Sequence, residues 1–505
     1  MPVPRVNIEY DSSVRYSHKE LSAGMVSSRP ARSVTILALV LLCIAPLLNA
    51  QPQQPAPGPV DLPKLSDEAT TWLRDLIRIN TTNPPGNELI AARYLSDILT
   101  REQIPNEVFE TAPGRGLLIA RLNAGPISDP TRALLLMGHL DVVGAQKSAW
   151  SVDPFGAVIR DGYLYGRGAI DDKGMTIANV AVMVELKRAH VRLSRDVVLL
   201  AEGDEEQGGD LGMDVAIHKY WDRIAAHYAL NESGRVMMHG GKVQYVGIQA
   251  SEKVPVDVDV VAKGTSGHAS IPLRDNAVLH LAAAIETIGA YEAPVQLNSV
   301  TRAYFEGLAQ VEDDDVAKWM RVLDTPDRGE HAARVLSDEN TVWNSMLRDS
   351  VVPTMLQAGI RPNVIPPEAS ATLNIRLLPG NQLEPLLAAL ASAIHDPRIT
   401  FEKQPSIGEP APSSPVDGGF FAYLQAQARQ EFGVSVVVPL MSTGGTDAAV
   451  LRTRNVEAYG LLPFPLNEDD IARMHGNDER IPVASFRQGV DFLYRVVSGF
   501  ATQPQ

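Results

Sequence analysis

Cysteine is almost absent from this chain of 505 residues, which contains a single one, Cys43. One cysteine cannot form a disulfide within the chain or supply a set of thiolate metal ligands. Any metal ion would therefore bind to His, Asp and Glu side chains. Basic residues are also in deficit, with 45 Lys+Arg against 60 Asp+Glu and a net charge of −15. This acidic balance argues against nucleic acid or an anionic membrane surface as a partner.

Long apolar runs are scarce, and the longest is at residues 34–45. Arg29 and Arg32 precede this run, and a possible cleavage site at residues 48–50 follows it. A basic segment, an apolar run and a cleavage site are, in this order, the parts of an export signal. The run is shorter than the ~20 apolar residues of a spanning helix, which makes a permanent membrane anchor the weaker alternative. We therefore predict a signal peptide over residues 1–50 and a periplasmic or extracellular protein without a stable membrane span. Its mature chain would carry no cysteine and a charge of about −17.

The rest of the chain is longer than one hydrophobic core usually supports, which suggests two domains. Helix-like segments alternate with short apolar runs from Lys64 onward, a pattern typical of an α/β fold with a largely parallel sheet. Near Ser251 the pattern changes to alternating strands and two helices, which predict a small α+β unit enlarged by a helical segment at about residues 301–350. The predicted divisions are the signal (1–50), a Pro-rich linker (51–63), the first part of a larger domain (64–252), an inserted domain (253–405) and the second part of the larger domain (406–505).

Three apolar runs of the larger domain are followed directly by polar residues. In open α/β sheets, ligands bind in the crevice at the carboxyl ends of the strands, so we expect these polar residues to converge. The runs and the residues that follow them are 133–137 with His139 and Asp141, 197–201 with Glu205 and Glu206, and 228–230 with Glu232.

Each of these patterns has a metal-binding and a simpler interpretation. His139 and Asp141 project to the same side of an extended segment, which suits a metal-bound imidazole oriented by a carboxylate, but a pair in the core or at the surface is commoner. Asp171, just before a predicted helix, could be a helix cap. The run of acids at residues 204–206 is either a solvated loop or a group held together by a cation.

Taken together and in order, these motifs resemble those of the M20 metallopeptidase and amidohydrolase family. The resemblance covers about residues 65–500, and its C-terminal motifs are most similar to the carboxypeptidase S and N-acyl-amino-acid hydrolase branch. It implies a split zinc-exopeptidase catalytic domain with a central mixed, largely parallel sheet, and an inserted α+β, ferredoxin-like domain that acts as a lid and often as a dimerisation surface. The motifs are Gly138-His-Leu-Asp-Val142, Asp171-Asp-Lys-Gly174, Asp204-Glu-Glu206, Asn231-Glu-Ser-Gly234 and His475-Gly-Asn477.

The resemblance also implies two Zn²⁺ ions per chain. Carried over position by position, it assigns His139 and Glu232 to one ion and Glu206 and His475 to the other. Asp171 would bridge both ions. His and carboxylate ligands suit Zn²⁺, and two such ions can share a water molecule.

Further residues acquire roles through the same resemblance. Glu205 would be the general base, and Asp141 would orient the imidazole of His139. His268 matches a family histidine that reaches the developing oxyanion, commonly from the partner subunit of a homodimer. The residues implied to bind a substrate carboxylate are Asn363, Arg376 and Gly445. For Arg376, a salt bridge within its strand is an equally good interpretation.

Three hypotheses about function follow. The leading one is an exported di-zinc exopeptidase of the carboxypeptidase or dipeptidase type, which hydrolyses an amide bond next to a free carboxylate. The second is an N-acyl-amino-acid amidohydrolase that uses the same site. The third, from another class, is a catalytically degenerate protein that only binds a ligand.

Overall fold

The computed structural model describes residues 58–125, 129–404 and 410–504, and the structural statements below refer to these residues. The predicted export signal, Cys43 and most of the predicted linker lie outside them. No helix of the described chain is both long and apolar enough to cross a membrane. The predicted linker ends earlier than expected, because helix α1 (Leu62–Arg78) begins two residues before Lys64, with the carboxylate of Asp61 accepting a hydrogen bond from the Lys64 backbone N–H.

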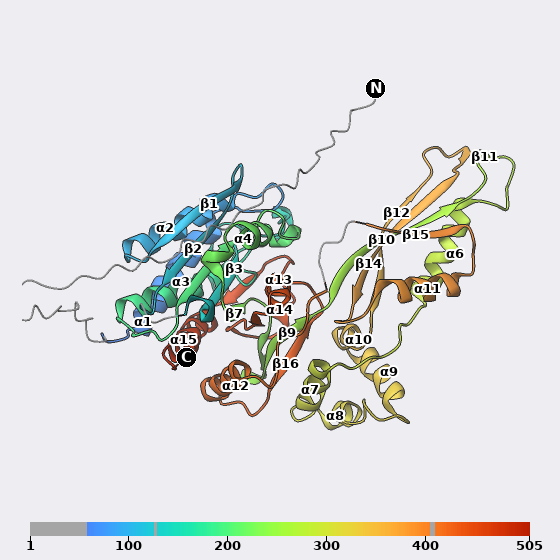
Figure 1. Ribbon diagram of the computed structural model, residues 1–505. Helices are drawn as coiled ribbons and strands as arrows, with labels where there is room; N and C mark the ends of the chain where they lie inside the picture. The colour runs from blue at the N-terminus through green and yellow to red at the C-terminus, as the bar shows by residue number, and fades with distance from the viewer. Residues whose placement is uncertain (1–57, 126–128, 405–409, 505) are drawn as a thin grey trace, which may run out of the picture. The chain divides into compact units, whose positions relative to one another are not determined.

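A mixed sheet of ten strands forms the larger domain (Figure 1). Its strands are β1 (Asn106–Ala112), β2 (Arg115–Leu122), β3 (Leu134–His139), β6 (Val197–Glu202), β7 (Tyr228–Asn231), β8 (Arg235–His239), β9 (Lys242–Glu252), β16 (Val437–Ser442), β17 (Glu457–Gly460) and β18 (Pro465–Leu466). They follow the order β1-β2-β6-β3-β7-β17-β9-β8-β18, and β16 pairs with β9. The central pairs β6/β3, β3/β7 and β7/β17 are parallel, whereas β1/β2, β2/β6 and β8/β9 are antiparallel. The predicted mixed, largely parallel sheet is confirmed.

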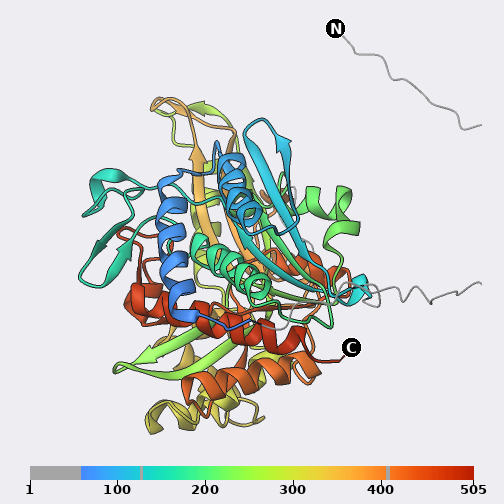
Figure 2. The same ribbon diagram turned by 90° about the vertical axis from the view of Figure 1, so that its left-hand side faces the viewer.

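Helices cover both faces of this sheet. Leu134 and Leu136 of β3 pack in one apolar cluster with α1, α2 (Glu88–Arg101), α3 (Lys173–Arg188) and α15 (Val483–Ala501). The alternate residues Leu135 and Met137 pack in a second cluster with α4 (Met213–Lys219) and α13 (Ala448–Thr453). Figure 2 shows α1, α3 and α15 side by side. Because both faces are covered, the strand is apolar along its whole length instead of alternating.

A second sheet, of four antiparallel strands, lies within residues 254–403 in the order β12-β14-β10-β15. Its strands are β10 (Val254–Lys263), β12 (Ser350–Ala358), β14 (Glu368–Leu377) and β15 (Ile399–Lys403), and helices α6 (Ala277–Gly289) and α11 (Leu383–Ile394) pack on it. This β-α-β-β-α-β order is that of the ferredoxin-like unit. The edge strand β12 was not among the predicted strands, because its exposed second half lacks the polar and apolar alternation on which the prediction relied.

The predicted helical segment between β10 and β12 is also present. It consists of α7 (Ser299–Leu308), α8 (Asp314–Met320), α9 (Gly329–Glu339) and α10 (Thr341–Leu347). It does not enlarge the small unit as expected: its apolar residues pack in the cluster of the large sheet, where α7 contacts β16, and none of them belongs to the cluster of the small sheet. The remaining elements are α5 (Trp221–Ile224), α12 (Gly419–Phe432), α14 (Glu468–Ile471), the pair β11 (Gly267–His268) and β13 (Val364–Ile365), the small sheet of β4 (Val158–Arg160), β5 (Tyr163–Tyr165) and β19 (Arg480–Pro482), and the 3₁₀ turns η1 (Pro130–Arg132), η2 (Lys147–Ala149) and η3 (Glu205–Gln207).

The three strands that were predicted to carry polar residues at their ends are neighbours. β3 pairs with β6 on one side and with β7 on the other, and all three run in the same direction. Their carboxyl ends therefore meet at one edge of the sheet, as expected for a ligand site of an open α/β sheet.

Candidate metal centre

Asp171 lies between two histidines. Its Oδ1 is 2.9 Å from Nε2 of His139, at the end of β3, and its Oδ2 is 3.0 Å from Nε2 of His475, in the loop after α14. A carboxylate that presents one oxygen to each of two imidazoles has the arrangement required of a ligand that bridges two metal ions.

Glu206 completes one side of this arrangement. Its Oε2 is 3.2 Å from Nε2 of His475. Its Oε1 is buried and has no hydrogen-bond partner among the described residues. An unsatisfied carboxylate oxygen is costly to bury, and a cation would compensate for it. The donor set of two imidazoles and several carboxylates therefore fits a metal ion with nitrogen and oxygen ligands, such as zinc.

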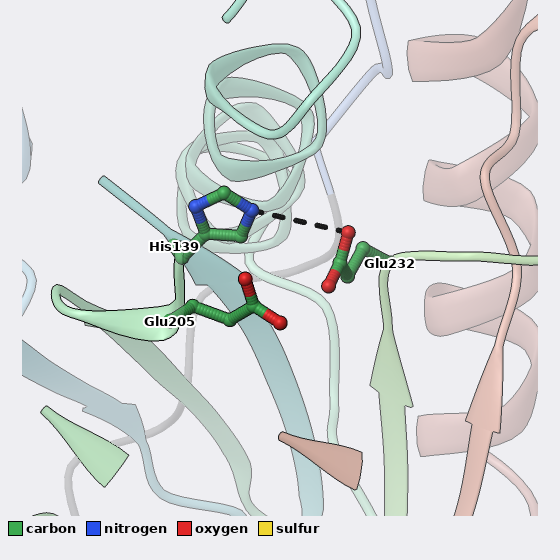
Figure 3. Close-up of side chains that lie close together, drawn as sticks. All are labelled: His139, Glu205 and Glu232. Carbon is green, nitrogen blue, oxygen red and sulfur yellow. Dashed lines mark ion pairs between the residues drawn. The ribbon is translucent and has the colours of Figure 1, made fainter. Parts of the chain in front are cut away.

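The other side consists of His139, Glu205 and Glu232, whose side chains converge in Figure 3. Nε2 of His139 is 3.9 Å from Oε2 of Glu232, and one ligand atom from each of the three side chains lies within 4.8 Å of the others. The same distance limit joins His139, Asp171 and Glu206. Glu205 was predicted as a base and not as a ligand, and the geometry places its carboxylate close enough to His139 and Glu232 to be a third ligand of an ion bound there.

The carboxylates of this cluster crowd one another. Burial raises the pKa of Glu205 well above its usual value, and the charge of Glu232 adds to the effect. Burial likewise raises the pKa of Glu232, with the charge of Asp171 next. Hydrogen bonds to Asp171 and Glu206 raise the pKa of His475 to about 10. The cluster without metal therefore binds extra protons, which metal ions would replace.

Asp141 holds the loop that carries both glutamates. Its carboxylate is fully buried and accepts hydrogen bonds from the backbone N–H groups of Glu205 and Glu206, each 3.2 Å long. Burial alone would raise the pKa of Asp141, but the nearby His139 imidazole, followed by the hydrogen bonds from Asn83 and the Glu206 backbone, lowers it overall. Nδ1 of His139 lies 3.0 Å from the carbonyl oxygen of Asp141 and 3.6 Å from its carboxylate Oδ1. The side-chain amide of Asn83, which sequence reasoning missed, donates a 2.8 Å hydrogen bond to the same carboxylate.

Arg167 and Glu479 form a second support that sequence reasoning missed. The buried carboxylate of Glu479 accepts hydrogen bonds from Nη1 of Arg167 (2.6 Å) and from the backbone N–H groups of Ile170 (2.8 Å) and Asp171 (3.2 Å). Nη2 of Arg167 donates to the carbonyl of Gly476 (2.8 Å). The pair therefore ties the Asp171 loop to the His475 loop. Both residues stand within a few positions of recognised motifs, which was the only signal available in the sequence.

A cavity of about 890 Å³ lies next to the metal cluster. Its lining includes Glu205 and His475 together with two of the predicted substrate-binding residues, Gly445 and Arg376. Nε of Arg376 donates to the side-chain oxygen of Asn374 (3.0 Å), and its two Nη groups make no hydrogen bond to the described residues. The guanidinium fork is therefore available to an anion.

His268 and Asn363 are not among the residues that line this cavity. Both are exposed: His268 ends β11 and Asn363 directly precedes β13, its antiparallel partner strand, and Ala269 donates a backbone hydrogen bond to the carbonyl of Asn363. Nδ1 of His268 accepts hydrogen bonds from the backbone and hydroxyl of Ser270. Within a single chain, these two predicted residues are therefore not brought together with the rest of the site.

The mixed sheet, with a histidine and carboxylate cluster at the carboxyl ends of its central strands, defines an α/β protein with a candidate metal site at the sheet edge. The model of Peptidase family M20/M25/M40 matches residues 135–499, and the chain belongs to this family. It is a hydrolytic enzyme of the carboxypeptidase, dipeptidase and acylase type, which sets aside the hypothesis of a protein that only binds a ligand.

The chain is similar along most of its length to curated and solved members of the family. It is 28% identical to human N-fatty-acyl-amino acid synthase/hydrolase PM20D1 over 75% of this chain and 76% of that protein. It is 29% identical to the probable carboxypeptidase S-like 2 of Dictyostelium discoideum over 74% and 72%. The M20 family metallo-carboxypeptidase Sso-CP2 from Sulfolobus solfataricus has the same fold, with a TM-score of 0.65 at 18% identity over 86% of this chain and 99% of that one. So does the dinuclear metal binding peptidase YXEP of Bacillus subtilis, with a TM-score of 0.56 at 14% identity over 87% and 100%.

The raised pKa values in this cluster predict how the stability of the metal-free protein depends on pH. Glu205, Glu232 and His475 contribute stability that is present at low pH. This contribution is lost as the pH rises through the pKa values of these groups in the folded protein. Asp141 and Asp171 have lowered pKa values, so their contribution disappears only below about pH 4. We expect the melting temperature of the chelator-treated protein to decrease as the pH is raised from about 5.5 to about 8.5. The increase in melting temperature on adding Zn²⁺ should become larger by several degrees over the same interval.

Differential scanning calorimetry at the two pH values would measure both effects. An Asp171→Asn variant serves as the control, because it loses the carboxylate that lies between His139 and His475 and should show little zinc-dependent gain. A gain that is equal at both pH values, or larger at the acidic one, would contradict the assignment of this cluster as a metal site.

Proposed function

We propose that the protein is an exported di-zinc exopeptidase of the carboxypeptidase or dipeptidase type, which hydrolyses an amide bond next to a free carboxylate. The observation that carries this proposal is the position of Asp171 between His139 and His475, beside a cavity that also contains Gly445 and Arg376. A site for two cations next to a site for one anion suits a substrate with a scissile amide and a terminal carboxylate. The similarity in fold to YXEP, a dinuclear metal binding peptidase, supports the assignment of two metal ions.

In this proposal, His139 and Glu232 would hold one Zn²⁺, Glu206 and His475 would hold the other, and Asp171 would be a ligand of both. The ions, when bound, supply Lewis-acid polarisation of the amide carbonyl and a lowered pKa for the attacking water. Asp141 fixes the backbone of Glu205 and Glu206 through its two hydrogen bonds. The Arg167–Glu479 pair holds the loops of Asp171 and His475 at a constant separation.

Glu205 accepts the proton of the attacking water and delivers it to the leaving nitrogen. Its backbone N–H donates to Asp141, which fixes the position from which its side chain extends toward His139 and Glu232. Arg376 and Gly445 bind the substrate carboxylate from opposite elements, β14 and the loop after β16. Asn363 and His268 belong to the same proposal through the family resemblance, and they need a second subunit to reach the site.

The second candidate is an N-acyl-amino-acid amidohydrolase. The similarity to PM20D1, an N-fatty-acyl-amino acid synthase/hydrolase, favours it. Both candidates use the same metals, base and carboxylate site, and they differ in what lies on the far side of the scissile amide. The inserted unit at residues 253–405 acts as a lid in either case.

Product analysis would test the proposed function. The zinc-loaded protein is incubated with a mixture of dipeptides and of N-acyl-amino acids that share the same C-terminal residue, and the released amino acids are measured by mass spectrometry. We expect release from the dipeptides to have the higher kcat/KM. A preference for N-acyl substrates would select the second candidate, and no release from either class would refute both.

Glu205→Gln tests the base. The amide keeps the shape of the side chain but cannot accept a proton, so we expect kcat to fall by about 10²-fold to 10⁴-fold. The zinc content, measured by inductively coupled plasma mass spectrometry, should stay at two ions per chain. Loss of an ion together with activity would instead identify Glu205 as a ligand, a position its proximity to His139 and Glu232 allows. Lys147→Gln, at an exposed ion pair with Asp153, is the control and should change neither quantity.

His268 is proposed to act in the site of a partner subunit, in a homodimer formed through the lid. The edge strand β12 supports such an interface, because it exposes Val352, Met355 and Leu356 along an unpaired sheet edge.

Complementation tests this assignment. His268→Ala and Glu205→Gln should each form inactive homodimers. Mixed under conditions that exchange subunits, they should regain about a quarter of the wild-type activity, because half of the dimers are mixed and each has one complete site. No recovery despite exchange, or a fully active monomer in analytical ultracentrifugation, would contradict the assignment.

A further inference from the structure

Glu252 lies at the junction of the two sheets. It is the last residue of β9 in the large sheet, and β10 of the small sheet begins two residues later, at Val254 (Figure 1). Lys253, between them, is buried, and its Nζ donates hydrogen bonds to the carbonyls of Ser345 (2.9 Å) and Arg348 (2.8 Å). The chain therefore crosses from one sheet to the other through a segment that is fixed by side-chain contacts.

The carboxylate of Glu252 is the centre of a buried polar network. Its Oε2 accepts hydrogen bonds from the Thr446 hydroxyl (2.7 Å) and from the Gln249 amide (2.7 Å), and it lies 3.0 Å from Nη2 of Arg452. Its Oε1 accepts the backbone N–H of Thr446 (3.2 Å). The side chain of Glu252 is 5% exposed and that of Arg452 is 1% exposed. A carboxylate with this many donors in a buried setting has one well-defined orientation.

Two of those hydrogen bonds end in the turn that is proposed to bind the substrate carboxylate. Thr446 directly follows Gly445, so the contact of its N–H with Glu252 fixes the plane of the Gly445–Thr446 peptide. The N–H of Gly445 itself has no partner among the described residues, and Gly445 lines the cavity together with Arg376. Gly444 is held in turn by the Ser442 hydroxyl, to which its N–H donates (3.2 Å).

The charge of Glu252 would oppose this binding unless it were compensated. Glu252 is one of the residues that line the cavity, and a substrate carboxylate next to it would meet a like charge. Arg452, in α13, neutralises Glu252 from the side of the protein interior. Because of this ion pair, the carboxylate of Glu252 can hold the turn although it lies beside the proposed site for the substrate carboxylate.

We propose that Glu252 and Arg452 are positioning residues for recognition of the substrate carboxylate. The pair fixes the turn at residues 443–446, in which Gly445 lines the cavity, at the point where β9 continues into the inserted unit that carries Arg376. This inference rests on the proposed function, because it assigns the turn to the carboxylate of the substrate. It adds two residues of this chain that act on the substrate carboxylate through the turn and are not metal ligands in the proposed set.

The test compares two substrates that differ in one group. The first is the carboxylate substrate that the wild-type enzyme cleaves best, and the second is its C-terminal carboxamide. Glu252→Gln replaces one of the two oxygens that accept hydrogen bonds from Thr446 by an NH₂ donor, and we expect the loss of this contact with the turn to outweigh the removal of a like charge. KM for the carboxylate substrate should rise by about tenfold or more, with kcat within about threefold of wild type. The kcat/KM for the carboxamide should stay within about twofold, because that substrate makes little use of the turn.

Thr446 supplies a second pair of variants that does not alter the buried charge. Thr446→Val removes the hydroxyl donor and should raise KM for the carboxylate substrate in the same selective way. Thr446→Ser keeps the donor, and its KM should stay close to that of the wild type. This pair decides the question if Glu252→Gln fails to fold. Glu102→Gln is the matched control, because it makes the same chemical change at an ion pair with Arg188 away from the cavity, and it should behave as wild type.

The outcomes separate this inference from the proposed function. A wild-type enzyme that cleaves the carboxylate and the carboxamide equally well would refute carboxylate recognition and this inference with it. If the wild type prefers the carboxylate substrate, the proposed function stands. The positioning role is then overturned by variants that lose activity on both substrates to the same extent, or by variants in which kcat falls and KM for the carboxylate substrate does not rise. A rise in KM for the carboxylate substrate alone, in both Glu252→Gln and Thr446→Val, supports the positioning role.

Discussion

The mutual repulsion of buried carboxylates at one edge of a sheet governs the organisation of this protein. The ends of β3, β6 and β7 bring Glu205, Glu206 and Glu232 together with Asp171, in surroundings where burial raises the pKa of Glu205 and Glu232. Such a group is stable only if protons or cations compensate for its charge. Much of the surrounding polar structure can be understood as holding this crowded group open for metal ions.

Two buried acids outside the proposed ligand set provide that support. Asp141 holds the backbone of the two glutamates after β6, and Glu479 holds the loop of Asp171 and, through Arg167, the loop of His475. Each of them uses a carboxylate to accept backbone N–H groups, which fixes loops more rigidly than packing alone. Segments far apart in the sequence are thereby locked into one geometry before any metal or substrate binds, which is the preorganisation that catalysis by differential binding requires.

In the proposed function, recognition of the substrate carboxylate would join the histidine and carboxylate cluster to the inserted unit. The cavity beside the cluster takes Gly445 from the large sheet and Arg376 from the small one, so the distance between these two groups depends on how the sheets are connected. The β9–β10 junction connects them, with Glu252 held by Thr446 and Arg452 and with Lys253 held by the carbonyls of Ser345 and Arg348. The same side chains therefore serve the stability of the junction and the geometry of the anion site.

The sequence by itself determined the fold class, most of the helices and strands, and the residues that the cluster brings together. These follow from local patterns: apolar runs that are followed directly by polar residues, apolar residues that recur every 2 or 3.6 positions, and motifs of a few adjacent residues. The tertiary structure alone decided which carboxylate faces which histidine, that Glu205 lies beside Glu232, that Asn83, Arg167 and Glu479 support the site, and that β12 closes the second sheet. The physical reason is that a hydrogen bond or ion pair between residues hundreds of positions apart, such as that of Arg167 and Glu479, leaves no periodic trace along the chain and exists only once the core has set the distance between its partners.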